Sequence, residues 1–306
     1  MIVFRFMKSF LECVPCILRQ VEEIGGRLFQ GDSEKRESLR AEASKILKST
    51  DIRSMTPPEA TSLVHHALSR LTGIDDFYKE IKKENNDFAL SLYPKLEDTM
   101  EASKDRMMMA IRLAIAGNII DYGAHSTFDV NASIKEAVNN DFMINDYEAF
   151  KRDLSRTGKV MFVGDNAGEI VFDKLLVKEL INDGKDVCYA VKSKAILNDA
   201  LISDAVSVSM AKIARVIESG SETAGTLLAS ATPEFRKAYD DSGIVIAKGQ
   251  GNLETLEDQG KRIYFLLKCK CEHLAKRLRC MPGAIILLGN SNARYDEFQK
   301  EDFCVA

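Results

Sequence analysis

Gly158-Lys159-Val160-Met161-Phe162-Val163-Gly164-Asp165-Asn166-Ala167-Gly168-Glu169 is the stretch that decides how this chain folds. It contains a short apolar run that ends at a glycine, and a helical pattern of apolar residues then continues to Asn182. Apolar runs without polar alternation are typical of strands that are covered on both faces, as in parallel sheets. The stretch therefore predicts a strand, a turn and a helix, the repeating unit of a doubly wound α/β fold.

Four further apolar runs of the same kind follow. They cover residues 187–191, 244–247, 263–267 and 284–288. Strands that alternate with helices favour a parallel sheet between two layers of helices. We therefore predict a Rossmann-like α/β/α domain over residues 155–306.

The first half of the chain has helical periodicity instead. The predicted helices span residues 10–28, 33–47, 56–73, 75–93 and 96–115. Thr56-Pro57-Pro58-Glu59 is typical of a helix start, because threonine caps well and proline suits the first turn. Gly73 is expected to end that helix. These patterns predict an all-helical domain over residues 1–154.

Composition excludes several classes of protein. At 306 residues the chain has room for two domains, and its formal net charge of −4 argues against nucleic-acid binding through bulk charge. The apolar runs are far shorter than the ~20 residues of a membrane helix, and no secretory signal is evident. Seven cysteines in a long chain indicate a reducing compartment. We expect a cytoplasmic protein without a membrane or nucleic-acid partner.

Polar residues follow the predicted strands at the edge where open α/β sheets bind ligands. Asp165-Asn166 follows the first strand and Asn198-Asp199 the second. Carboxylate and amide oxygens are ligands that Mg²⁺ and Mn²⁺ prefer. The sequence thus predicts a metal site formed by Asp165, Asn166 and Asp199. The alternative is that Asp165 and Asn166 only form a loop and cap the next helix.

Lys248-Gly249-Gln250-Gly251-Asn252 follows the third strand. Its glycines would let backbone N–H groups approach an anion, and Lys248 would supply a point charge for a phosphate. The alternative is an ordinary turn with a surface lysine. Beside a metal site, these residues favour phosphoryl-transfer chemistry.

Taken in order and spacing, these motifs resemble those of the damage-control phosphatase family, long catalogued as domain of unknown function 89. The stretches concerned are Asp165 to Glu169, Asn198-Asp199 and Lys248 to Glu254. Cys13-x-x-Cys16 with Leu18-Arg19-Gln20, and Ala116-Gly117-Asn118-Ile119-Ile120-Asp121, resemble its cysteine-containing prokaryotic branch. The resemblance covers essentially the whole chain. It implies a helical domain on a Rossmann-like domain, and metal-dependent hydrolysis of small phosphomonoester metabolites with Mn²⁺, Co²⁺, Ni²⁺ or Mg²⁺.

The resemblance also implies roles for individual residues. Asp165, Asn166 and Asp199 would be metal ligands and, with Lys248, catalytic. Lys248 would hold the phosphate. The residues that would assist it or touch the substrate are Asn198, Gly249, Gly251, Asn252, Asn118 and Asp121. Asn118 and Asp121 would otherwise cap a helix end. The family's Arg-x-x-Pro is here Lys192-x-x-Ala195, which bears on phosphate orientation and substrate choice because lysine is not a bidentate fork.

Three reactions or roles fit these residues. In the favoured one, a metal-activated water attacks phosphorus while Lys248 and loop N–H groups stabilise the phosphate oxygens. Asp165 as a covalent nucleophile is disfavoured, because such phosphatases resemble D-x-D-x-T after the first strand. The alternatives are an S-adenosylmethionine-dependent protein carboxyl methyltransferase and a non-catalytic metal- or nucleotide-binding protein.

We expect the cysteines and histidines mainly to pack within the protein. Cys13, Cys16, Cys269 and Cys271 could form a structural zinc site if both pairs met, but buried free thiols are favoured. The adjacent histidines His65-His66 point about 100° apart on a helix, so packing is expected. Asp204 is a minor candidate for supporting Asp199.

Overall fold

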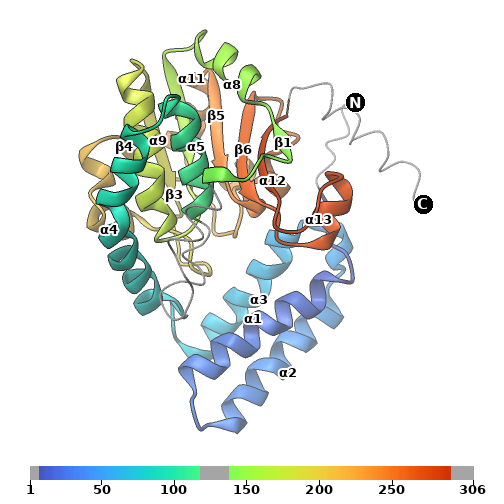
Figure 1. Cartoon of the computed structure of the whole chain (residues 1–306). Coiled ribbons are helices and arrows are strands. Elements are labelled where there is room, and N and C mark those ends of the chain that lie inside the picture. The colour runs from blue at the N-terminus through green and yellow to red at the C-terminus, as the bar shows by residue number, and fades with distance from the viewer. Residues whose placement is uncertain (1–6, 118–137, 291–306) are drawn as a thin grey trace.

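The computed structural model describes residues 7–117 and 138–290, and its centre is a seven-stranded sheet between helices (Figure 1). The strand order is β1-β7-β6-β5-β2-β3-β4. Neighbouring strands are parallel except for the antiparallel pair β6 and β7. The strands are β1 (Ile144–Asn145), β2 (Lys159–Val163), β3 (Asp186–Val191), β4 (Arg215–Glu218), β5 (Ile244–Lys248), β6 (Ile263–Lys268) and β7 (Ile285–Gly289).

Helices cover both faces of the sheet, and the first three form a lobe beside it (Figure 1). The helices of the lobe are α1 (Cys13–Leu28), α2 (Ser33–Ser49) and α3 (Pro57–Thr72). Those on one face are α4 (Lys79–Glu101), α5 (Arg106–Ala116), α8 (Tyr147–Leu154), α9 (Glu169–Asn182) and α10 (Ile202–Ser207). Those on the other are α11 (Pro233–Asp241), α12 (Gln250–Leu256) and α13 (Glu272–Arg277). The predicted fold class is confirmed.

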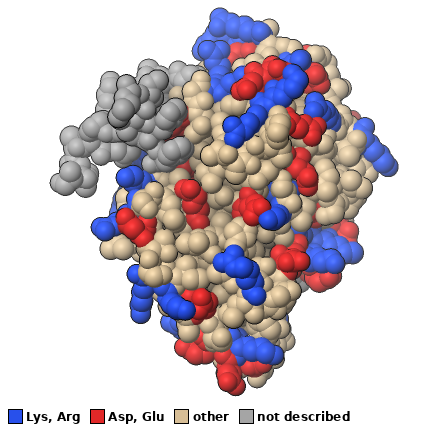
Figure 2. Space-filling model, turned by 180° about the vertical axis from the view of Figure 1, so that it is seen from behind, with Lys and Arg blue, Asp and Glu red and all other residues tan. Residues whose placement is uncertain are grey.

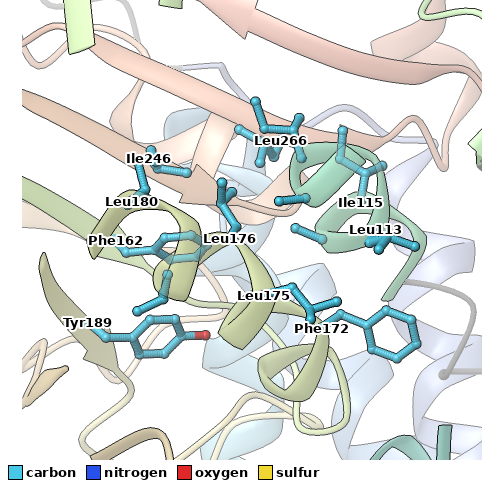
Figure 3. Close-up of a cluster of buried hydrophobic side chains, with 14 of the residues drawn as sticks. Leu113, Ile115, Phe162, Phe172, Leu175, Leu176, Leu180, Tyr189, Ile246 and Leu266 are labelled. Atoms are coloured by element: carbon cyan, nitrogen blue, oxygen red, sulfur yellow. The ribbon is translucent and has the colours of Figure 1, made fainter. Parts of the chain in front are cut away.

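Alternate residues of the strands enter two different hydrophobic cores. Phe162 and Ile246 belong to the core on the α9 side, whereas Met161 and Val245 belong to the core under α11 and α12. This is why the strands are apolar at consecutive positions. Burying one such side chain contributes about 1.5–3 kcal/mol. Figure 3 shows the α9 side, where strand residues Phe162, Tyr189, Ile246 and Leu266 meet Phe172, Leu175, Leu176 and Leu180 of α9 and Leu113 and Ile115 of α5.

The start of α3 confirms the motif read from the sequence. The Thr56 backbone N–H donates to Glu59 Oε2 (2.7 Å), and Thr56 Oγ1 accepts a bond from the Glu59 backbone N–H (3.4 Å). The two residues thus form a capping box. Gly73 ends the helix with a φ of 70°, a left-handed conformation that favours glycine.

The prediction of two helices separated at Pro94 is wrong. Helix α4 continues through Pro94 to Glu101, and α5 begins after Asp105, whose side chain accepts a bond from the Met108 backbone N–H. A proline inside a helix costs about 3 kcal/mol. Packing outweighs this cost, because the α4 residues on both sides of Pro94 pack into the core on the α9 side of the sheet.

One pair of strands departs from the parallel arrangement that the sequence predicts. β7 runs antiparallel to β6 because the chain turns straight back. The Cys269 backbone N–H donates to Ala284 O (2.9 Å), and that of Gly283 donates to Cys269 O (2.7 Å). Helix α13 therefore lies within the hairpin-like connection between β6 and β7, and this connection does not cross the sheet. Short strands β1 and β4 were not predicted.

The division of the chain at residue 154 into two domains stays a prediction. Helices α4 and α5, which precede that position, pack against α9 and share its hydrophobic core. The separate lobe of α1 to α3 has its own core. Within the described residues, no helix is both long and apolar enough to cross a membrane. On the face drawn in Figure 2, acidic and basic side chains are interspersed.

Candidate active site

The candidate site lies where the direction of strand succession reverses, between β2 and β5. These strands are neighbours, so the loops that follow them meet at the carboxyl edge of the sheet. Ligands of open α/β sheets bind at such a point. Gly249 follows β5 with a φ of 80°, and a Cβ placed on it would overlap the carboxylate of Asp165, which follows β2. The two loops are therefore in direct contact.

Backbone bonds join the loop after β3 to the loop after β2. The Ala167 N–H donates to Asn198 O (2.9 Å), and the Ala200 N–H donates to Asp165 O (2.8 Å). Asn166 and Asp199 face each other as an isolated antiparallel bridge. The structure thus brings Asp165, Asn166 and Asp199 together from segments more than thirty residues apart.

The amide of Asn166 is held in one orientation. Its Nδ2 donates to Glu169 Oε1 (2.9 Å) and lies 3.4 Å from Asp165 Oδ2. Because the amide nitrogen points to these carboxylates, the amide oxygen is directed to the opposite side. Asn166 is therefore arranged to offer an oxygen to a ligand.

Asp199 has an unsatisfied oxygen. The residue is only 2% exposed, and its Oδ2 has no hydrogen-bond partner in the described structure. Lys192 Nζ lies 3.6 Å from that oxygen, beyond good hydrogen-bond distance. Burial raises the pKa of Asp199 to about 7. Burial, together with the negative charges of Glu169 and Asp199, raises the pKa of Asp165 well above its usual value.

These features fit a divalent cation. The carboxylates of Asp165, Glu169, Asp173 and Asp199 outnumber the ammonium groups of Lys192, Lys248 and Lys270 around them. Such an excess of negative charge takes up either protons or a metal ion. Asp165, Asn166 and Asp199 supply hard oxygens at this edge of the sheet, and Oδ2 of Asp199 is buried without a hydrogen bond, with Lys192 Nζ 3.6 Å away. These three residues are therefore suited to hold Mg²⁺ or Mn²⁺.

Lys248 has partners that the sequence did not suggest. It is 1% exposed, and its Nζ donates to Glu169 Oε2 (2.9 Å) and Asp173 Oδ1 (2.8 Å). Tyr189 donates its hydroxyl hydrogen to the other oxygen of Asp173 (2.8 Å). Withdrawing Lys248 toward a phosphate would leave two buried carboxylates facing each other. Its phosphate-binding role stays a prediction that this geometry does not favour.

Asn252 and Gly251 serve the architecture of the loops. Asn252 Nδ2 donates to Lys248 O (2.7 Å) and Gly164 O (3.1 Å), while its Oδ1 accepts from Thr226 Oγ1 (2.8 Å). A Cβ on Gly251 would overlap Ala224 O, so glycine permits a close backbone approach. Their phosphate contacts, like that of Asn198, stay predictions. Asn118 and Asp121 lie outside the described residues.

Three residues beside the site were not functional candidates from the sequence: Glu169, Asp173 and Lys270. Glu169 and Asp173 are four residues apart on α9, a spacing that places both on one helix face. Lys270 follows β6, and its positive charge lowers the pKa of Asp165. The sequence signal for Lys270 is a lysine directly after a strand, between Cys269 and Cys271.

A structural zinc site, the less favoured alternative for the cysteines, stays a prediction. The two pairs do approach each other, because Cys13 and Cys271 interact electrostatically. Cys16 is exposed and Cys269 is buried. Over residues 7–117 and 138–290, no three side chains of histidine, cysteine, aspartate or glutamate gather as a metal site. The Cys271 thiol instead accepts hydrogen bonds from the Leu274 backbone N–H and from Gln250 Nε2, both at 3.3 Å. Burial raises the pKa of Cys269 to about 12, as expected of a packed thiol.

His65 is expected to make the protein sensitive to acid. Its Nε2 accepts a bond from the Leu197 backbone N–H (3.4 Å), and burial lowers its pKa from 6.5 to about 4. Between these values the unfolded chain binds more protons, so stability falls as the pH drops. The loss is about 2 kcal/mol by pH 5. Urea unfolding at pH 7 and pH 5 should show this loss in the wild type and a smaller one in His65→Gln. Equal losses in both would contradict it.

Comparison with known proteins shows the family to which this chain is similar. The family model for the damage-control phosphatase ARMT1-like domain matches residues 9–286. An uncharacterised protein of Methanocaldococcus jannaschii is 32% identical over 90% of this chain and 94% of its own length. A damage-control phosphatase of Archaeoglobus fulgidus is 31% identical over 92% of this chain and 98% of its own. The crystal structure of a relative from Pyrococcus horikoshii, named a damage-control phosphatase, superposes with a TM-score of 0.85 at 29% identity, covering 93% of this chain and 100% of that one.

Proposed function

The chain belongs to the damage-control phosphatase ARMT1-like domain family, and from that premise we propose that it is a metal-dependent phosphatase acting on small phosphomonoester metabolites. Relatives named damage-control phosphatases support a phosphatase role in general. The observation that supports the finer proposal is the meeting of Asp165, Asn166 and Asp199, where one buried oxygen of Asp199 accepts no hydrogen bond.

In this proposal, Asp165, Asn166 and Asp199 hold the cation, which is Mn²⁺, Co²⁺, Ni²⁺ or Mg²⁺. A bound divalent cation would polarise a phosphate oxygen and lower the pKa of a water molecule. Glu169 keeps the Asn166 amide turned toward the ligand, because it accepts the bond from Nδ2. Lys248 holds Glu169 in place. These residues therefore preorganise the site before the substrate arrives.

Two lysines beside the site, Lys270 and Lys192, have different roles in this proposal. Lys270 is exposed at the carboxyl end of β6, and its charge acts on Asp165. Lys192 is buried beside Asp199, and its Nζ donates to Gly225 O. Lys270 can meet an incoming anion at the surface, whereas Lys192 is only 2% exposed. We therefore assign phosphate capture to Lys270, and the orientation of Asp199 to Lys192.

Hydrolysis of p-nitrophenyl phosphate tests the proposal. We expect EDTA to abolish turnover and Mn²⁺, Co²⁺, Ni²⁺ or Mg²⁺ to restore it. Asp165→Asn should reduce kcat/KM by more than ~100-fold, the upper end of what a partner outside the ligand shell costs. Asp183→Asn, which changes an exposed acid at the end of α9, is the matched control and should keep full activity. Metal-independent turnover, methyl transfer or metal binding without hydrolysis would contradict the proposal.

A further inference from the structure

One side chain of the helical region connects the two loops of the candidate metal site. Asn86 of α4 is 3% exposed. Its Oδ1 accepts a bond from the Gly168 backbone N–H (2.7 Å), and its Nδ2 donates to Asp204 Oδ1 (2.8 Å). The other oxygen of Asp204 accepts a bond from the Leu201 backbone N–H (2.9 Å). Gly168 lies two residues after Asn166, and Leu201 lies two residues after Asp199.

The helix that carries Asn86 and the side chain of Asp204 are both held firmly in place. Helix α4 packs along α9 in the main hydrophobic core. One turn before Asn86, the buried Lys82 places its Nζ 2.7 Å from Asp76 Oδ2 and 3.6 Å from Asp204 Oδ2. Asp204 is thus fixed between a lysine, an amide and a backbone N–H. The Asn86–Asp204 pair acts as a spacer of set length between the two loops.

We propose that Asn86 is a positioning residue that sets the separation between Asp165–Asn166 and Asp199, and so tunes the affinity for the cation. The inference rests on the proposed function for the identity of that ligand. Cations such as Mg²⁺ bind at about 2.0–2.1 Å with nearly ideal octahedral geometry, so small shifts of one loop weaken the site. Asn86 itself does not touch the cation, because both ends of its amide are already bonded within the protein.

The test compares Mn²⁺ dissociation constants, measured by electron paramagnetic resonance of free Mn²⁺ at 25 °C, with melting temperatures. Asn86→Ala should raise the dissociation constant by about 10–100-fold, as loss of an outer-shell partner does. Tyr264→Phe is the matched control, because it removes a buried hydrogen bond to Asp153 at the opposite end of the sheet. It should lower the melting temperature and leave the dissociation constant unchanged within twofold.

The outcomes separate this inference from the proposed function. If Asn86→Ala lowers the melting temperature but binds Mn²⁺ like the wild type, Asn86 is only structural and the inference is overturned. If the wild type and Asp165→Asn bind Mn²⁺ equally, the metal site itself is wrong and both proposals fail. Asp204→Asn, which keeps the volume but can accept only one of the two bonds, should raise the dissociation constant if Asn86→Ala does not fold. An unchanged constant in that folded variant would equally overturn the inference.

Discussion

Replacing Gly249 with alanine is expected to abolish both metal binding and phosphatase turnover in a chain that still folds. The new Cβ would overlap the carboxylate of Asp165 and push it out of the site. Gly249 also has a φ of 80° and a ψ of 164°, a region that is essentially restricted to glycine and costs other residues about 1–3 kcal/mol. That cost is smaller than a typical stability of 5–15 kcal/mol, so folding survives.

Gly184→Ala is the matched control for this substitution. Gly184 has a φ of 77°, but no atom lies within 4 Å of the position its Cβ would take. The variant therefore has backbone strain without a collision. Circular dichroism should show both variants folded with lowered melting temperatures, while electron paramagnetic resonance should detect Mn²⁺ binding only in Gly184→Ala. Wild-type Mn²⁺ affinity in Gly249→Ala would show that the Asp165 carboxylate is not a ligand.

The second large effect is expected on stability. Lys248→Met should lower the free energy of unfolding by about 3–5 kcal/mol, because it removes the positive charge that lies between two buried carboxylates. Glu169 and Asp173 have no exposed surface, and Lys248 is the ammonium that lies within 3 Å of both. Burial already raises the pKa of Asp173 to about 6 with the lysine present. Urea unfolding at pH 7 measures the loss.

Two further variants test whether the loss of stability comes from the buried charges. Lys248→Met combined with Asp173→Asn should recover part of the lost stability, because one of the stranded charges is removed. Lys83→Met breaks an exposed ion pair with Asp87 and should leave stability nearly unchanged. Should Lys248→Met instead unfold at the wild-type urea concentration and lose only affinity for phosphate, the earlier expectation from the sequence would be right and the structural role wrong.

The arrangement of Asp165, Asn166 and Asp199 could be predicted because it depends only on strand order. Residues that follow neighbouring parallel strands must meet at one edge of the sheet. The role of Lys248 could not be predicted in the same way. A lysine after a strand reads as a charge available for a ligand, and its partners Glu169 and Asp173 lie in a helix whose apolar periodicity says nothing about buried ion pairs.

Two features of the fold differ from the prediction because they depend on contacts between distant parts of the chain. Pro94 predicts a helix end from local chemistry, but packing of α4 against the sheet keeps the helix intact. The reversed direction of β7 depends on backbone bonds between Cys269 and the residues that precede β7, which no periodicity reveals. The role of Asn86 could not be predicted, because a single asparagine in a polar helix has no pattern that points to its distant partners Gly168 and Asp204.

We propose that Asp165, Asn166 and Asp199 form one divalent cation site, beside which phosphate binds. Anomalous diffraction from crystals grown with Mn²⁺ and orthophosphate tests it most directly. We predict one manganese peak at about 2.1 Å from oxygens of all three residues, with phosphate bound to the ion on the side of Lys270. A manganese ion bound elsewhere, or clear density at these residues with neither ion nor phosphate, would contradict the claim.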